Sequence, residues 1–110
     1  MQLSVTGRHV DITDSMRHFA EEKLGRLTRF YDRIVSIEVI LDQESALHRL
    51  EVLVRADHKN TFVGKVDAND FYEAVDLVVE KLERQLTKHK EKHRNRKHPG
   101  KSGQKSESAE

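Results

Sequence analysis

The spacing of the apolar residues changes along this chain, and this change limits the possible folds more than any other feature. Alternating apolar residues, typical of half-buried strands, occur in four segments, at residues 2–8, 34–41, 47–56 and 61–66. Apolar residues three and four positions apart, typical of amphipathic helices, occur over residues 14–29 and again from residue 71 to about residue 92 or 94. The sequence therefore predicts the element order β-α-β-β-β-α.

This element order favours one compact arrangement. The strand–helix–strand crossover at the start predicts that the first two strands are parallel, with a right-handed connection. The remaining strands follow one another as a meander, and both helices need a surface on which to bury their apolar stripes. We therefore predict an α/β two-layer sandwich, in which two helices cover one face of a four-stranded sheet. The predicted domain spans residues 1–94, and residues 95–110 form a basic tail that we expect to be disordered.

Some local details follow from the same pattern. Thr13 is expected to cap the first helix, and Asp67 or Asp70 is expected to cap the second. Gly25, inside the first predicted helix, suggests a close approach to the sheet. In the strand at residues 34–41, the odd-numbered apolar residues, Val35 included, are expected to face the core, while Ile34 faces away.

Composition excludes several classes of function. The chain has no cysteine, which excludes disulfides, thiolate nucleophiles and cysteine-bound metals. It has neither an apolar run long enough to span a membrane nor a Gly-rich phosphate loop, so we expect a soluble, intracellular protein without a nucleotide cofactor. His89 and His93 are spaced as two zinc ligands could be, but no third ligand is evident, and we interpret both as solvated. His48, Asp57 and His58 could be taken for an acid–base group, but they lie in different strands and turns, and nothing in the sequence fixes their geometry. We therefore predict no catalytic residue, metal, cofactor or small-molecule substrate.

Charge is distributed unevenly along the chain. Residues 1–80 contain ten Lys/Arg and fifteen Asp/Glu, a net charge of −5, whereas residues 81–105 contain ten Lys/Arg and two Asp/Glu, a net charge of +8. Half of the basic residues therefore lie within 25 positions. Such a block indicates either contact with a polyanion or a solvated surface, and its concentration after an acidic domain favours the polyanion.

Within this block, four basic residues share one side of the predicted second helix. Spacings of three, four and four residues place them in a column beside the buried stripe, about 16 Å long at 1.5 Å per residue: Lys81, Arg84, Lys88 and Lys92. A column of this kind on a rigid helix can contact successive phosphates. The first helix adds Lys23 and Arg26, although Glu21 and Glu22 dilute their charge. Beyond Leu86 the apolar stripe stops, so the end of the second helix is expected to overhang the domain.

The second helix also carries a recognisable string of residues. The letters DFYEAVD at 70–76, KLERQL at 81–86 and KHK at 88–90 resemble the ribosome hibernation-promoting factors, also called the protein Y family. Residues 1–7 and 10–13 are similar to the first strand and the first helix cap of that family. The resemblance covers about residues 1–92. We expect the short form, because 110 residues leave no room for the second, dimerising domain of the long form. The tail from about residue 95 departs from the family pattern, since it is longer than in the shortest members and is basic, not acidic.

The resemblance implies a cytoplasmic, non-enzymatic factor that is associated with the ribosome. Such factors bind the small ribosomal subunit near the decoding centre, block mRNA and A- and P-site tRNA, and inhibit translation under stress or in stationary phase. The implied contacts to ribosomal RNA are made by Lys23, Arg26, Lys81, Arg84, Lys88 and Lys90. Helix geometry alone adds Lys92 to this set. We expect a monomer off the ribosome and no membrane partner.

Two alternatives remain open. The protein could be a general double-stranded RNA-binding module of similar build. It could instead be a protein-interaction module that uses apolar residues on the outer face of its sheet, for which the strand pattern suggests Ile34, Ile40, Leu53 and Val63.

Overall fold

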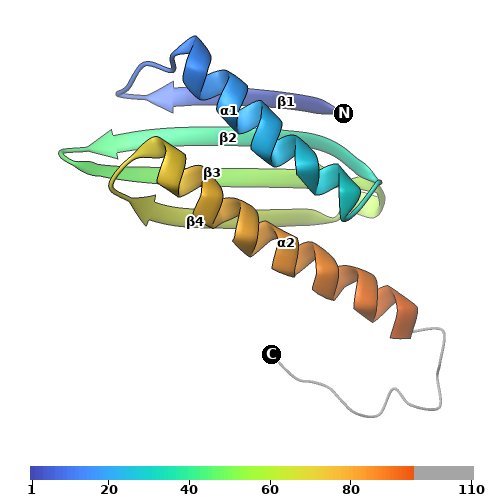
Figure 1. The fold of residues 1–110 in the computed structure, drawn as a ribbon. Coiled ribbons are helices and arrows are strands. Elements are labelled where there is room, and N and C mark those ends of the chain that lie inside the picture. The colour runs from blue at the N-terminus through green and yellow to red at the C-terminus, as the bar shows by residue number, and fades with distance from the viewer. Residues whose placement is uncertain (96–110) are drawn as a thin grey trace.

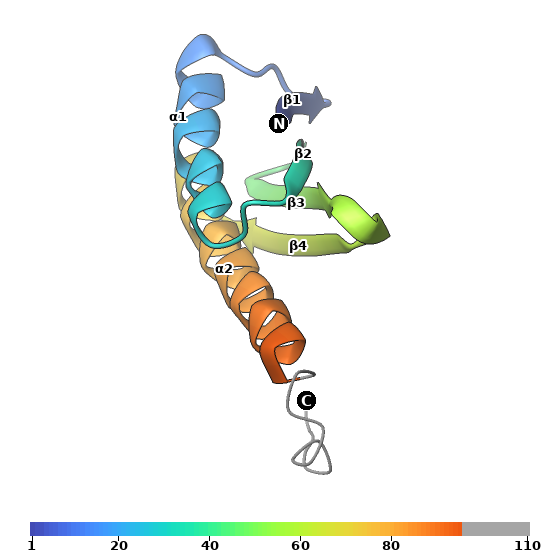
Figure 2. The same cartoon turned by 90° about the vertical axis from the view of Figure 1, so that its right-hand side faces the viewer.

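The structure, a computed structural model, describes residues 1–95, in which two helices cover one face of a mixed four-stranded sheet (Figures 1 and 2). The strands are β1 (Gln2–Arg8), β2 (Ile34–Glu44), β3 (Leu47–Ala56) and β4 (Thr61–Ala68). The helices are α1 (Asp14–Gly25), which continues into the 3₁₀ turn η1 (Arg26–Arg29), and α2 (Phe71–Asn95); a second 3₁₀ turn, η2 (Asp57–Lys59), joins β3 to β4. The predicted sandwich and element order are confirmed.

The strands lie in sequence order, β1-β2-β3-β4. β1 pairs with β2 in parallel, with Val5 opposite Val39, as the crossover through α1 predicts. The other two pairs are antiparallel, with Val52 opposite both Val39 and Gly64. β1 and β4 are therefore the edge strands, and the side chains of all four strands alternate between the covered face and the open face.

The core lies between the covered face of the sheet and the two helices. Ile37, Val39, Val52 and Val54 are fully buried on the two central strands. Each helix adds a stripe at the spacing of three and four residues that the sequence shows. α1 and η1, together called the first helical segment, contribute one stripe, made of Ala20, Leu24 and Leu27. α2 contributes the other, made of Phe71, Ala74, Val75, Val78, Leu82 and Leu86. Residues that are far apart in sequence thus form one continuous apolar layer.

A β-bulge at the start of β2 reverses two predicted orientations. Ile34 pairs with Ala56, but Ser36 pairs with the adjacent Arg55, so β2 holds one extra residue at this point. The extra residue is Val35, which is 56% exposed, while Ile34 is 7% exposed and joins the core. The predictions that Val35 faces the core and that Ile34 lies on the outer face are therefore wrong.

Both helices begin at caps that the sequence predicts. The Thr13 hydroxyl accepts a hydrogen bond from the Met16 N–H at 3.1 Å. The Asp70 carboxylate accepts one from the Glu73 N–H at 2.8 Å, and the Glu73 carboxylate accepts one from the Asn69 N–H at 3.4 Å. Asp70, not Asp67, is thus the cap of α2. The helix expected over residues 14–29 is α-helical only to Gly25 and continues as η1.

The close approach between helix and sheet occurs at Gly64, not at Gly25. A Cβ atom on Gly64 would lie 2.8 Å from Val78 Cγ2 and 3.2 Å from Leu82 Cγ. A Cβ atom on Gly25 would have no neighbour within 4 Å. The prediction that Gly25 permits close packing is therefore wrong, and the residue that permits it lies in β4, beneath α2.

The last turns of α2 project beyond the sheet, as the end of the apolar stripe predicts (Figure 1). The helix reaches Asn95, one residue beyond the domain boundary expected at residue 94. The remainder of the predicted basic tail, residues 96–110, lies outside the described residues.

Candidate nucleic-acid interface

Side chains of α2 fasten the helix to the free edge of β4. The Lys81 ammonium donates a hydrogen bond to the Lys65 carbonyl oxygen at 2.9 Å, and the Gln85 amide donates one to the Val63 carbonyl oxygen at 2.8 Å. An edge strand otherwise presents such groups to water or to another strand. Together with the contact at Gly64, these bonds hold one flank of α2 along β4.

This flank carries the predicted basic column. Lys81, Arg84 and Lys88 are exposed and line a surface groove of about 690 Å³, which residues of β4 and Phe30, the residue after η1, also line. β4 contributes Val63, Gly64 and Lys65. The structure therefore brings together the three residues on which helix geometry and the family resemblance agree.

The remaining predicted residues lie elsewhere. Lys92 is exposed on α2 beyond the groove, and Lys90, two residues after Lys88, is turned about 200° around the helix. Lys23 and Arg26 lie on the first helical segment and do not line the groove. The Lys23 ammonium lies 5.4 Å from the centre of the Phe19 ring, where the ring face attracts a cation. The predicted contacts thus form one clustered group and several separate positions.

Acidic neighbours modify the charge of the groove. Glu80 and Glu83 also line it, and the Glu80 carboxylate lies 4.0 Å from the Arg84 guanidinium. On α1, the Glu22 carboxylate lies 3.7 Å from the Arg26 guanidinium. All four side chains in these two pairs are largely exposed, and exposed pairs one helical turn apart contribute only about 0.3–0.5 kcal/mol. A phosphate can therefore replace either carboxylate at small cost.

Sequence reasoning missed Lys65 and Gln85. Alternation along the fourth strand assigns Lys65 to the outer face, but it does not show that this strand is an edge or that α2 lies beside it. Nothing in the sequence indicates that Gln85 binds the β4 edge, because a polar residue next to a buried stripe usually faces water. Lys65 also lies 4.0 Å from the Glu51 carboxylate across the sheet.

His89 was expected to be solvated, and the structure shows otherwise. Its ring is half-buried and makes edge contacts with the rings of Tyr31 and Phe62, at centroid distances of 5.4 and 5.2 Å. It is the last residue of α2 with such a contact among the described residues. His89 therefore anchors α2 at the end of the sheet where the basic overhang begins.

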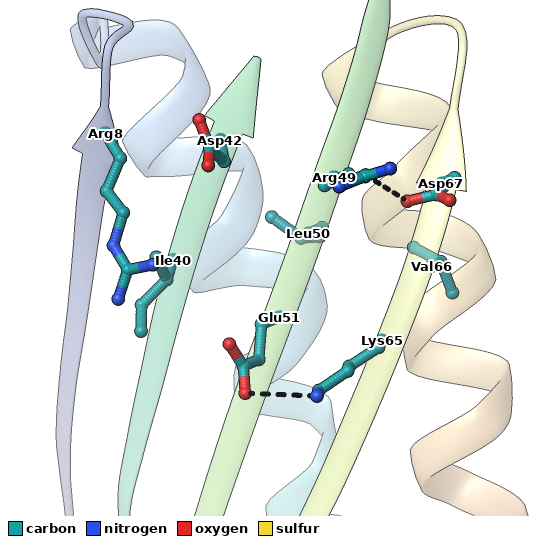
Figure 3. Close-up of a pocket in the computed structure, with 9 residues that line it drawn as sticks. All are labelled: Arg8, Ile40, Asp42, Arg49, Leu50, Glu51, Lys65, Val66 and Asp67. Carbon is teal, nitrogen blue, oxygen red and sulfur yellow. Dashed lines mark ion pairs between the residues drawn. The ribbon is translucent and has the colours of Figure 1, made fainter. Parts of the chain in front are cut away.

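The open face of the sheet bears a second, polar hollow (Figure 3). One row across it has alternating charge, with Arg8, Asp42, Arg49 and Asp67 on successive strands. Arg49 lies 3.5 Å from Asp67, and the Lys65–Glu51 pair follows in the next row. Arg49 and Lys65 thus each have a carboxylate neighbour on this face, and the Lys65–Glu51 contact, at 4.0 Å, is the longer of the two.

Neither a metal site nor a membrane-spanning helix occurs in the described residues. Among residues 1–95, no group of three or more His, Cys, Asp or Glu side chains could hold a metal ion. None of the helices in this part of the chain is both long and apolar enough to cross a membrane.

Known proteins are similar to this chain in both sequence and fold. Residues 3–94 match the family model described as "Sigma 54 modulation protein / S30EA ribosomal protein". The ribosome hibernation promoting factors of Azotobacter vinelandii and Escherichia coli K12 are 40% and 36% identical over 92 residues, which cover 84% of this chain and 85% and 96% of theirs.

Solved structures agree with this match. A ribosomal subunit interface protein from Coxiella burnetii superposes with a TM-score of 0.76 at 32% identity, covering 82% of this chain and 98% of that one. The N-terminal domain of Thermus thermophilus Protein Y superposes with a TM-score of 0.73 at 30% identity, covering 81% and 99%.

Proposed function

The chain belongs to the Sigma 54 modulation protein / S30EA ribosomal protein family, and on that premise we propose that it is a ribosome hibernation factor. In this proposal it binds the small ribosomal subunit near the decoding centre and is cytoplasmic and monomeric when free. It is not an enzyme, because the family consists of ribosome hibernation and modulation factors. The observation that carries the proposal is the clustering of Lys81, Arg84 and Lys88 on one fixed flank of α2.

The physical basis of the proposal is charge on a rigid support. Ribosomal RNA is bound here through phosphates and shape, without reading of base sequence. The cations of α2 fix the position of the domain, while the net charge of −5 on residues 1–80 disfavours other orientations against RNA. Lys23, Arg26, Lys90 and Lys92 extend the contact beyond the groove.

Inhibition would then be steric. The domain occupies the space of mRNA and of A- and P-site tRNA, so factor and tRNA compete for one volume. Synthesis of such a factor under stress or in stationary phase would keep ribosomes inactive but intact. No bond is made or broken, and the whole effect follows from occupancy.

The first test measures binding and competition together. We expect saturable, one-to-one co-sedimentation with purified small subunits, and loss of the factor when tRNA fills the decoding site. If five or six phosphates are contacted, the logarithm of affinity should fall against the logarithm of salt with a slope of about −4 to −5. Equal binding to small subunits, large subunits and a naked RNA duplex would instead indicate a general double-stranded RNA-binding protein.

The second test reverses the charge of the column. Lys81→Glu with Arg84→Glu should lower small-subunit affinity by at least about 100-fold, because two favourable phosphate contacts become repulsive. Since Lys81 also holds the β4 edge, Lys81→Gln with Arg84→Gln provides a variant that keeps a hydrogen-bond donor. Arg8→Glu with Lys59→Glu is the matched control, because neither residue lines the groove. Affinity within about twofold of wild type for both α2 variants would contradict the proposal.

The interaction-module alternative has lost part of its support. Ile34, one of its four predicted residues, is in the core, and Ile40 and Leu53 are half-buried. Val63, at 40% exposure, lines the groove beside the basic column. Because the bulge exposes Val35 in place of Ile34, the exposed apolar residues are not the set that the strand pattern suggested.

A further inference from the structure

The groove between α2 and β4 has a built shape that the basic column alone does not explain. Lys81, Arg84 and Lys88 form its helical wall, and Val63 and Lys65 form its strand wall. We propose that this groove holds a single strand of small-subunit ribosomal RNA along the β4 edge, and that Lys65 is a further phosphate-binding residue. This inference rests on the proposed function and adds to it a strand-borne cation and a path for the RNA.

Side chains of α2 partly occupy the β4 edge, which disfavours the addition of a peptide strand. A partner that adds to a sheet edge needs the main-chain carbonyls of that edge as acceptors. Those of Lys65 and Val63 already accept hydrogen bonds from Lys81 and Gln85. Recognition through side chains is therefore favoured in this groove, which suits a sugar–phosphate backbone better than a polypeptide.

The hydrogen bond of Lys81 prepares it for a phosphate. An ammonium group has three N–H donors, and the bond to the Lys65 carbonyl uses one of them. The same bond fixes the position of a side chain that would otherwise move freely. Lys81 can thus stay bonded to the β4 edge while it donates to a phosphate oxygen with its remaining hydrogens.

The charge and length of the groove fit a short run of phosphates. Four cations line it against two carboxylates, those of Glu80 and Glu83. Lys81 and Lys88 are seven residues apart, or roughly 10 Å along the helix axis. At about 3.4 Å of axis per phosphate in one stacked strand, that length spans about three phosphates.

The strand wall completes the fit. Val63 is 40% exposed and offers an apolar surface to a sugar or a base. Lys65 stands on the same outer face of β4, two residues further along; its own side chain is exposed, and the half-buried Glu51 carboxylate lies 4.0 Å away, a long contact that contributes little. Lys65 can therefore turn from Glu51 to a phosphate at small cost.

Site-directed cleavage tests the path directly. Because the chain has no cysteine, a single introduced cysteine is the only thiol that an iron–EDTA reagent can label. Lys65→Cys and Arg8→Cys place the probe on the same sheet face at opposite edges (Figure 3). Bound to small subunits, the probe at position 65 should cut ribosomal RNA at a localised site, whereas the probe at position 8 should cut weakly or elsewhere.

A third probe separates the two proposals. Lys88→Cys lies on the helical wall, so cleavage from position 88 without cleavage from position 65 would overturn the groove path and leave the proposed function standing. Cleavage from none of the three positions, in samples that do not co-sediment with small subunits, would contradict both.

Affinity gives an independent measure. Lys65→Ala should weaken small-subunit binding by about five- to tenfold and make the salt slope shallower by about 0.7–0.9, the change expected from one lost phosphate contact. Lys65→Arg should restore both, and Arg8→Ala should change neither. Wild-type affinity and slope for Lys65→Ala, measured beside an inactive Lys81→Glu/Arg84→Glu variant, would show that Lys65 binds no phosphate.

Discussion

The two helices cover the same face of the sheet, yet they are attached to it in different ways. α2 lies close enough to β4 that only glycine fits at position 64, and two of its side chains hydrogen-bond to the β4 edge. α1 is tied to the β1 edge by one such bond, from the Arg17 guanidinium to the Val5 carbonyl at 3.3 Å, and Gly25 at its end faces open space.

This difference in attachment indicates which helix holds its cations in a fixed position, as the proposed function requires. A column of cations selects a surface only if its charges are held in a fixed geometry, which the close packing of α2 provides. On α1, Lys23 lies over the Phe19 ring and Arg26 pairs with Glu22, so both cations have partners within their own helix. We therefore expect α2 to determine where the domain sits on the ribosome and α1 to add affinity.

The largest expected effect that tests this comparison is at Gly64. Gly64→Ala forces a Cβ atom to within 2.8 Å of Val78 Cγ2, so the Val78 side chain must repack or α2 must move away from β4. We expect a loss of about 1–3 kcal/mol in the free energy of unfolding, the usual cost of overpacking a core. Urea denaturation measures the loss, and small-subunit affinity should fall with it because Lys81 and Gln85 lose their register with the β4 carbonyls.

Val78→Ala provides the control, because it makes room for the added methyl group. The double variant Gly64→Ala/Val78→Ala should be more stable than the sum of the two single losses predicts. Strict additivity would mean that the close approach does not set the position of α2.

The next effect concerns the helix caps. Asp70→Ala removes a charged acceptor 2.8 Å from the Glu73 N–H, and Thr13→Ala removes a neutral one 3.1 Å from the Met16 N–H. We expect both losses to lie near 1 kcal/mol in thermal unfolding, with the larger at Asp70 because a charged acceptor also interacts with the helix dipole. Asp70→Asn should recover part of the loss. An equal or greater loss at Thr13 would contradict this ranking of the two helices.

The sequence predicts well those features that depend on local pattern. The change in apolar spacing identified all six main elements. Single residues identified the cap of α1 and reduced the cap of α2 to two candidates, Asp67 and Asp70. The basic column followed from helix geometry, because Lys81, Arg84 and Lys88 share a flank in any α-helix. Each of these inferences needs only residues within one segment.

The wrong or missing predictions of orientation and contact all depend on how separate segments meet. The bulge that exposes Val35 and buries Ile34 depends on how β2 pairs with β3, which alternation alone does not reveal. The position of Lys65 in the groove depends on β4 being an edge strand, and that of His89 depends on two rings from other elements. Gly25 was assigned the role of Gly64 because a glycine in a helix pattern is noticeable, whereas its effect on packing depends on what lies opposite.

The smallest effect is at Gly25, and its expected sign is opposite to that at Gly64. Gly25 has helical dihedral angles, φ −60° and ψ −24°, which alanine adopts without strain, and its added methyl group would meet no atom within 4 Å. Alanine also restricts the unfolded chain, so Gly25→Ala should stabilise the protein by about 0.4–1 kcal/mol. The urea midpoint should rise with an unchanged slope, and small-subunit affinity should stay within about twofold of wild type. A destabilised Gly25→Ala variant would mean that the end of α1 packs as closely as α2 does, and the contrast between the two helices would then be lost.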